Sequence, residues 1–105
     1  MNHAIYDAVA ERAAGRCEQC AHPFADTLKD RPECDHFFGR ARSESVETCW
    51  LLCGNCHRAK SAGDPSAGYW LIRYAIFCRR HSYLEVLDRA LRDLEFKTVK
   101  EALST

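Results

Sequence analysis

The two ends of the chain carry apolar residues at helical spacing. Residues 3–14 have helical spacing at Ile5, Ala8, Val9, Arg12 and Ala13, and Gly15 follows the pattern. Apolar positions three and four residues apart are typical of an amphipathic helix, and a glycine just beyond them is typical of its end. The pattern therefore predicts a short N-terminal helix.

The middle of the chain holds shorter apolar runs. Residues 33–38 end in two aromatics and predict a short strand. Residues 48–52 are apolar and predict either a second strand or an irregular arm, and residues 55–62 predict a short helix. Residues 21–32 contain two prolines and several polar side chains, which is typical of a loop.

Two further helices are predicted in the C-terminal third. Asp64 followed by Pro65 is typical of a helix start with Asp as the N-cap, so this helix is expected to run to about Arg80. Ser82 and Glu85 have the spacing of a capping box that opens a last helix. That helix carries a leucine stripe: Leu84, Leu87, Leu91 and Leu94. We expect the two helices to pack on each other and on the core, which slightly favours a monomer.

Composition and charge narrow the class of protein. The chain has 105 residues, which suits one domain, and its 47% hydrophobic and 29% charged residues are typical of a globular fold. Fifteen basic and fifteen acidic residues cancel, which excludes a general polycation but not a local basic patch. The chain contains no long apolar run and no signal-peptide pattern at its start. We therefore expect a cytoplasmic protein with no membrane segment.

Seven cysteines are a high number for this length. In a cytoplasmic protein they favour metal binding over disulfides. Four of them form two CxxC pairs: Cys17, Cys20, Cys53 and Cys56. Two such turns complete a tetrahedral four-cysteine site of the kind that holds structural zinc. The alternatives are two redox pairs, which usually accompany a βαβ pattern that this chain lacks, and buried free thiols. The other three are expected to be packed thiols: Cys34, Cys49 and Cys78.

Acidic and imidazole side chains lie beside the cysteine pairs. Asp35 and His36 are adjacent on the first predicted strand, where neighbouring side chains point to opposite faces unless the strand bends. One of them can then hold a metal while the other faces a substrate. His57 directly follows Cys56, and Lys60 lies three residues further along the same helical face. The alternatives are a surface acid, a packed histidine and, for His57, a substitute zinc ligand.

These motifs in this order resemble the HNH endonuclease family, and in particular its zinc-stapled, phage-type members. The resemblance rests on CxxC, the Asp-His pair, a leucine-rich arm and CxxCHxxK, and it covers residues 17 to about 63. It implies an α+β fold with a ββα-metal core (also called a His-Me finger) over about 16–63 and a helical extension over about 64–105. The whole chain, 1–105, would then be one nuclease domain, and a phage, prophage or host-defence setting is implied.

The resemblance also implies roles for individual residues. His36 is implied to be the general base that takes a proton from water. Asp35 and His57 are implied to be the ligands of one catalytic divalent ion, Mg²⁺ or Mn²⁺, with Ni²⁺, Co²⁺ or Zn²⁺ as substitutes. Thr48 stands where the family usually has Asn, which restrains the loop near the base, and its hydroxyl can make a related bond. The implied reaction is hydrolysis of DNA phosphodiester bonds.

Four basic residues are predicted to form a rim around this site: Arg40, Arg42, Arg58 and Lys60. Phosphate contacts from such a rim give affinity without reading a base sequence, and the implied partner is double-stranded DNA. For each single arginine, a solvated surface position is the alternative. Two other functions stay open. The first, which Thr48 favours, is a non-catalytic zinc module that binds DNA or protein. The second is a redox or metal-sensing protein.

Overall fold

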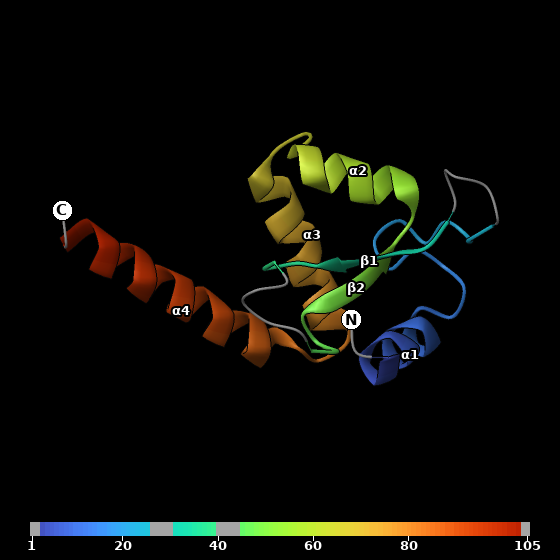
Figure 1. Cartoon of the computed structure of the whole chain (residues 1–105), viewed down its shortest axis with the longest axis horizontal. Coiled ribbons are helices and arrows are strands. Elements are labelled where there is room, and N and C mark those ends of the chain that lie inside the picture. The colour runs from blue at the N-terminus through green and yellow to red at the C-terminus, as the bar shows by residue number, and fades with distance from the viewer. Residues whose placement is uncertain (1–2, 26–30, 40–44, 104–105) are drawn as a thin grey trace.

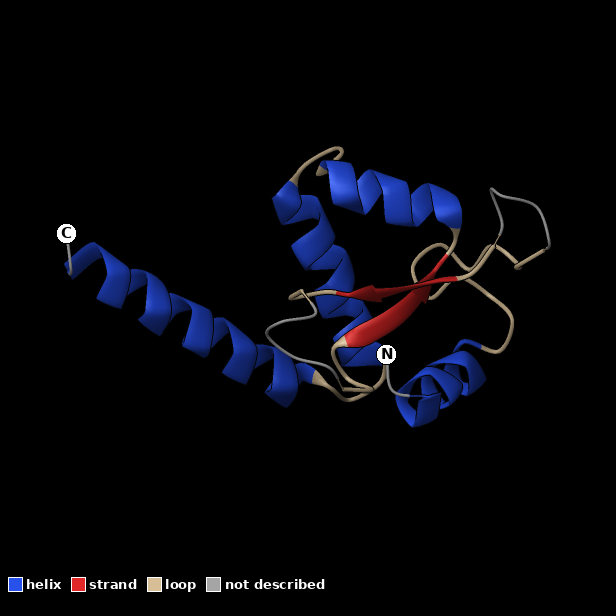
Figure 2. Cartoon of the chain, in the orientation of Figure 1, coloured by secondary structure: helices blue, strands red, loops and turns tan. Residues whose placement is uncertain are grey.

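The computed structural model describes residues 3–25, 31–39 and 45–103. Over these residues the chain is a small α+β protein with four helices and one two-stranded antiparallel sheet (Figures 1 and 2). The elements are α1 (His3–Ala13), β1 (Glu33–His36), β2 (Cys49–Leu52), α2 (Gly54–Ala62), α3 (Ala67–Arg80) and α4 (Leu84–Leu103). The predicted order of helices and strands is confirmed, and residues 48–52 supply a strand rather than an irregular arm.

The two faces of the sheet carry two apolar clusters. β1 pairs with β2 so that Glu33 lies opposite Leu52 and His36 lies opposite Cys49. Side chains alternate along each strand, so Trp50 and Leu52 share one face while Cys49 and Leu51 share the other. Cys49 and Leu51 pack against Val9 and Ala13 of α1. The opposite face packs on α3, through a cluster that includes Trp50, Leu52, Trp70, Tyr74 and Phe77. Helix α3 therefore braces the sheet from the side opposite α1.

Helix α3 begins at Ala67, with Ser66 as its N-cap, and the prediction that Asp64 caps it is wrong. The Ser66 hydroxyl accepts a hydrogen bond from the Tyr69 N–H at 3.0 Å. Asp64 instead closes the preceding helix, because its N–H donates to the Ala59 carbonyl at 2.9 Å. Gly63 makes this possible by adopting a φ of +66°, the left-handed conformation that ends many helices.

The predicted capping box at Ser82 is also wrong. Ser82 has a φ of +63°, whereas an N-cap residue is normally extended. Its N–H donates to the Arg79 carbonyl at 3.3 Å, and the Tyr83 N–H donates to the Cys78 carbonyl at 2.6 Å. This pair of bonds is the Schellman motif that terminates a helix. Ser82 is therefore used to end α3, and α4 begins two residues later.

Helix α4 confirms the predicted last helix, but it packs on the molecule only near its start. Leu87 is 6% exposed, whereas Leu84 and Leu91 are 47% and 37% exposed. Beyond these turns the helix runs away from the body of the molecule (Figure 1). The expectation that the leucine stripe packs within the chain therefore holds for one of the three leucines whose side chains are described.

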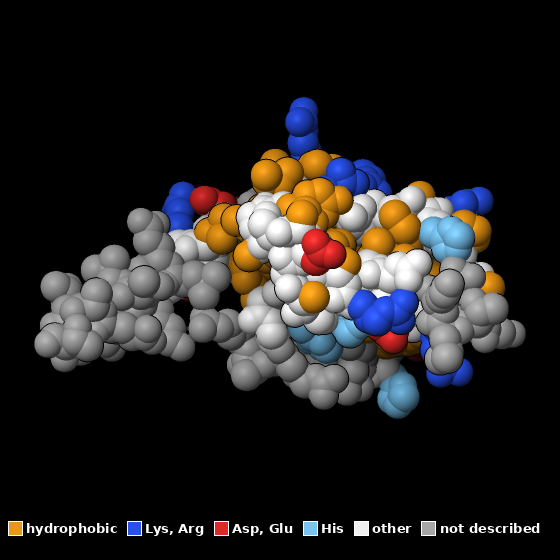
Figure 3. Space-filling model, turned by 90° about the horizontal axis from the view of Figure 1, so that it is seen from above, with side chains coloured by type: hydrophobic (Ala, Val, Ile, Leu, Met, Phe, Trp, Pro, Cys, Tyr) orange, Lys and Arg blue, Asp and Glu red, His pale blue; other side chains and the backbone are white. Residues whose placement is uncertain are grey.

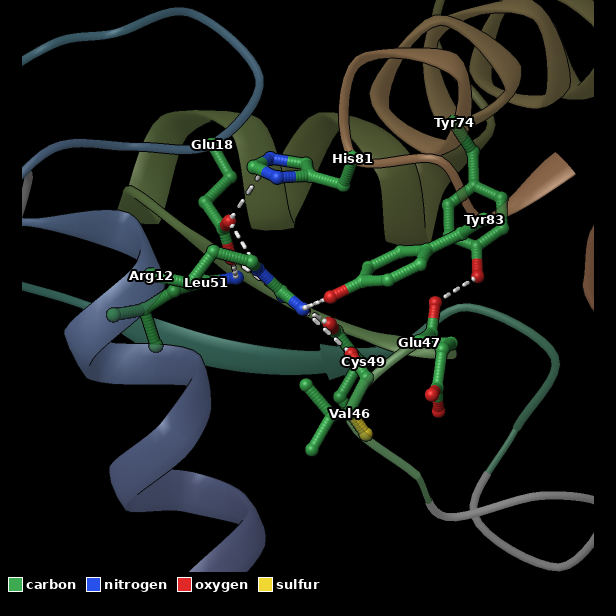
Figure 4. Close-up of polar contacts among 9 residues, drawn as sticks. All are labelled: Arg12, Glu18, Val46, Glu47, Cys49, Leu51, Tyr74, His81 and Tyr83. Carbon is green, nitrogen blue, oxygen red and sulfur yellow. Dashed lines mark hydrogen bonds and ion pairs between the residues drawn. The ribbon is translucent and has the colours of Figure 1, made fainter.

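A buried ion pair joins α1 to the sheet (Figure 4). The Arg12 guanidinium donates to both carboxylate oxygens of Glu18, at 2.7 and 2.9 Å, and to the carbonyls of Val46 and Cys49, each at 2.7 Å. Glu18 also accepts a hydrogen bond from the Leu51 N–H at 3.0 Å. Burial acts to lower the pKa of Arg12, and the hydrogen bonds and negative charge of Glu18 outweigh it and raise that pKa. The pair fixes α1, the first cysteine turn and β2 relative to one another.

Arg12→Leu is expected to lower the free energy of unfolding by about 3–5 kcal/mol, because it leaves the buried Glu18 carboxylate without its partner. Adding Glu18→Gln to this variant should recover part of the loss, since the uncompensated charge is then gone. Urea unfolding followed by circular dichroism measures both. A loss below about 1 kcal/mol in Arg12→Leu, the size typical of an exposed ion pair, would contradict this account.

Candidate metal centre and hydrolytic site

Four cysteines from two distant segments meet in one group. Cys17 and Cys20 lie in the turn after α1, while Cys53 and Cys56 lie at the start of α2. Their Sγ atoms all lie within 4.8 Å of one another, and Cys20 Sγ is 3.8 Å from Cys53 Sγ. None of the cysteines forms a disulfide. Four converging thiols are the donor set of a closed tetrahedral site, so the group is placed to hold a metal ion such as zinc.

The local backbone presents these thiols to one point. The Cys17 N–H donates to the His22 carbonyl, and the Ala21 N–H donates back to the Cys17 carbonyl, each at 2.9 Å. A hydrogen bond from Cys56 lowers the pKa of Cys17 to about 4, and the same contact raises the pKa of Cys56. The thiolate is the form that binds metal, so an ion that binds here would have to displace the protons of Cys20 and Cys56, whose pKa values are raised. Across the described residues, no second set of three or more metal-binding side chains meets this closely.

The two predicted ligands of the divalent ion approach each other. Asp35 lies on the face of β1 toward α2, with its side chain 9% exposed, and His57 lies on the first turn of α2. His57 Nε2 is 3.8 Å from Asp35 Oδ1. One carboxylate oxygen and one imidazole nitrogen suit the partial coordination of a divalent ion such as Mn²⁺, so the two residues fit the implied group as two of its ligands.

Glu33 is a site residue that the sequence analysis missed. Its Oε2 atom lies 2.5 Å from His57 Nδ1. In neutral His57 this contact places the proton on Nδ1 and leaves the Nε2 lone pair on the side of Asp35. Glu33 and Asp35 are two residues apart on one strand and therefore share a face. Because every second residue of a strand lies on the same face, the sequence could have indicated that Glu33 lies beside Asp35.

Lys60 lies inside the site rather than on an outer rim. Its Nζ is 3.0 Å from Asp35 Oδ2 and 3.2 Å from Oδ1, and it sits 5.0 Å from the centre of the Phe37 ring. The Trp50 indole N–H donates to Asp35 Oδ2 at 2.9 Å. The Asp35 carboxylate is therefore held by one cation and one neutral donor.

His36, the predicted base, is the last residue of β1 and lies opposite Cys49. Strand alternation puts His36 on the other face of the strand from Asp35. A hydrogen bond from Cys34 lowers the pKa of Cys49, although burial opposes it. The structure thus brings Asp35, His57 and Lys60 together and places His36 at the end of the same strand.

Thr48 restrains the backbone beside His36. Its side chain is buried, and its hydroxyl accepts a hydrogen bond from the Ser45 N–H at 3.1 Å. The Thr48 carbonyl accepts a hydrogen bond at 3.0 Å from the N–H of Phe37, the residue after His36. The Tyr74 hydroxyl donates to the neighbouring Glu47 carbonyl at 2.6 Å. The segment that enters β2 is therefore fixed by both side-chain and backbone bonds.

The predicted basic rim is described only in part. Arg58 is exposed on α2 and donates to Asn55 Oδ1 at 2.7 Å, while Arg40 and Arg42 lie outside the described residues. Figure 3 views the molecule from the side of α2. In that view the described Lys and Arg side chains are separated by apolar and neutral ones.

Comparison of the chain with protein-family models and with curated proteins finds no match. Within the described part of the chain, every helix is too short or too polar to cross a membrane.

Proposed function

We propose that the chain is a metal-dependent DNA endonuclease of the HNH type. The observation that carries the proposal is the approach of His57 Nε2 to Asp35 Oδ1, 3.8 Å apart on different elements, with Glu33 on the other nitrogen of His57. The order β1, β2, α2 and the contacts of α2 with both strands support a ββα arrangement. Because α2 begins at the cysteine group, a structural zinc there would fix the position of His57.

In this proposal each site residue has its own role in the hydrolysis of a phosphodiester. His36 takes a proton from water, whose oxygen attacks phosphorus, and the bond to the 3′ oxygen breaks as that oxygen gains a proton from a solvent water. Asp35 and His57 would hold the divalent ion, and Glu33 keeps His57 Nε2 directed toward Asp35. When bound, the ion supplies positive charge that stabilises the phosphodiester and the leaving 3′ oxygen. Thr48 holds the backbone next to the base.

Double-stranded DNA is the proposed substrate. The formal charge of the chain is zero, so affinity has to come from a few local contacts. Arg58 is exposed on the same helix as His57, and Arg40 and Arg42 are predicted on the opposite side of the site. Such contacts go to phosphates and make binding depend on salt rather than on base sequence.

A plasmid assay tests the proposal. The zinc-loaded chain is incubated with supercoiled plasmid, with and without Mg²⁺ or Mn²⁺, and the conversion to open-circular or linear DNA is measured. We expect conversion only when a divalent ion is present. Binding of DNA without conversion under any of these ions would instead support the non-catalytic zinc module, which the Asp35–Lys60 ion pair also suits.

A further inference from the structure

The ammonium group of Lys60 contacts the same carboxylate oxygen as the proposed ion site. Oδ1 of Asp35 lies 3.8 Å from His57 Nε2 and 3.2 Å from Lys60 Nζ. The Lys60 side chain is 16% exposed and that of Asp35 is 9% exposed, so water screens this pair only weakly. A positive charge of the chain itself therefore neutralises Asp35 at the point where a divalent ion would bind.

We propose that Lys60 is a displaceable internal counterion that competes with the divalent ion for Asp35. The inference rests on the proposed function, because it concerns the ion site of that function. A bound Mg²⁺ lies about 2.0–2.1 Å from its oxygen ligands. An ammonium about 3 Å from the same oxygen would then face a double positive charge at close range in a weakly screened site. Because Lys60 Nζ lies 3.2 Å from Oδ1 and 3.0 Å from Oδ2, an ion bound to either oxygen meets its charge, and we expect Lys60 to move away from Asp35 as the ion binds.

The surroundings of Lys60 allow its ammonium to move away from Asp35 while the Asp35 carboxylate keeps its orientation. The four-carbon stem of lysine is flexible, and only one end of it is held. The Trp50 N–H stays on Oδ2, so the carboxylate keeps its orientation when the ammonium moves away. A released ammonium on α2 is then free to contact a DNA phosphate. Ion binding and DNA binding would therefore favour each other through one side chain.

Titration of Mn²⁺ into the zinc-loaded chain, without DNA, tests the competition. Binding is followed by the electron paramagnetic resonance signal of free Mn²⁺ at constant low ionic strength. Lys60→Met keeps most of the side-chain volume and removes the charge, and we expect it to tighten Mn²⁺ binding about tenfold. Arg58→Met is the matched control. It removes an exposed charge from the same helix and should change the affinity by about twofold or less. Asp35→Asn should abolish binding at this site.

A second measurement uses the wild-type chain. Acetylation of individual lysines is quantified by peptide mass spectrometry with and without Mg²⁺. An ammonium held by a carboxylate reacts slowly, so Mg²⁺ should speed acetylation of Lys60 several-fold relative to the other lysines. An unchanged or slower rate would overturn the competition, whether or not the methionine variant folds.

The outcomes separate this inference from the proposed function. The competition between Lys60 and the ion is overturned if Lys60→Met binds Mn²⁺ no more tightly than wild type. It is also overturned if the gain in affinity is no larger than that of Arg58→Met. Either result holds even when wild type cuts DNA. If Lys60→Met tightens binding while wild type never cuts DNA, the nuclease proposal fails and the role of Lys60 stands. If wild type and Lys60→Met bind no Mn²⁺ that depends on Asp35, the inference fails together with the ion site.

Discussion

Cys17→Ser is expected to abolish the cooperative folding of the chain and its zinc content. Structural zinc sites supply about 10–16 kcal/mol of apparent free energy, which is comparable to or larger than the total stability of most domains, about 5–15 kcal/mol. Cys17 is 3% exposed, meets three other thiols and belongs to the larger apolar cluster. Losing its thiolate removes one metal ligand and leaves a hydroxyl among apolar side chains. Circular dichroism and elemental analysis measure both effects.

Cys78→Ser is the matched control. Cys78 is 1% exposed and packs in the same cluster, but it is not one of the four converging thiols. We expect this variant to lose about 1–3 kcal/mol, the cost of burying a polar group, and to keep one zinc per chain. Wild-type protein purified without chelators and found free of zinc would refute the metal centre. Equal losses in the two variants would show that packing rather than the metal stabilises the fold.

The elements that the sequence predicted well are those set by local pattern. The spacing of apolar residues along the sequence predicted the bounds of α1, β1, β2 and α2 to within about two residues. The CxxC spacing identified the four cysteines, because each short turn fixes two thiols wherever the turns later meet. These signals lie within a few residues of one another and need no knowledge of tertiary contacts.

The errors fall where one residue serves two elements. Asp64 and Ser82 both have the side chains of N-cap residues, yet their backbones end α2 and α3 respectively. A left-handed Gly63 and a left-handed Ser82 decide this; glycine favours that conformation at a helix end, whereas nothing in the sequence predicts it for serine. Arg12 shows the same limit, because its place on an apolar helix face is explained only by tertiary contacts with Glu18 and with the carbonyls of Val46 and Cys49.

The sequence analysis singled out Asp35, His57 and Lys60, which the structure brings together, but it did not predict which charges pair among them. The resemblance named Asp35 and His57, which the fold brings within 3.8 Å, but it was silent on Glu33. The predicted basic rim included Lys60 as a phosphate contact, whereas its ammonium lies on Asp35. The position of a lysine in the sequence does not show whether its side chain extends into solvent or folds back onto the protein. For Lys60 this depends on the Asp35 carboxylate, which only the tertiary structure places beside it.

His36→Ala is expected to lower the rate of plasmid cleavage by about 10²–10⁴-fold while leaving zinc content and Mn²⁺ affinity unchanged. The factor is the usual contribution of a positioned general base, and alanine removes the proposed proton acceptor without touching the proposed ion ligands. His36 is the last residue of β1 and lies on the opposite face from Asp35, so its loss should not disturb the Asp35–His57 pair. Single-turnover cleavage and Mn²⁺ titration give the two quantities.

Asp35→Asn and His57→Ala complete the comparison. Both should lose cleavage and Mn²⁺ binding together, because each removes a proposed ligand of the ion. Glu33→Gln should weaken Mn²⁺ binding about 10–100-fold, since a residue that orients a ligand acts on the metal through it. The site therefore predicts two kinds of inactive variant that a metal titration separates. If His36→Ala also loses Mn²⁺ binding, His36 is a ligand rather than the base. If it cleaves as fast as wild type, the base is another residue.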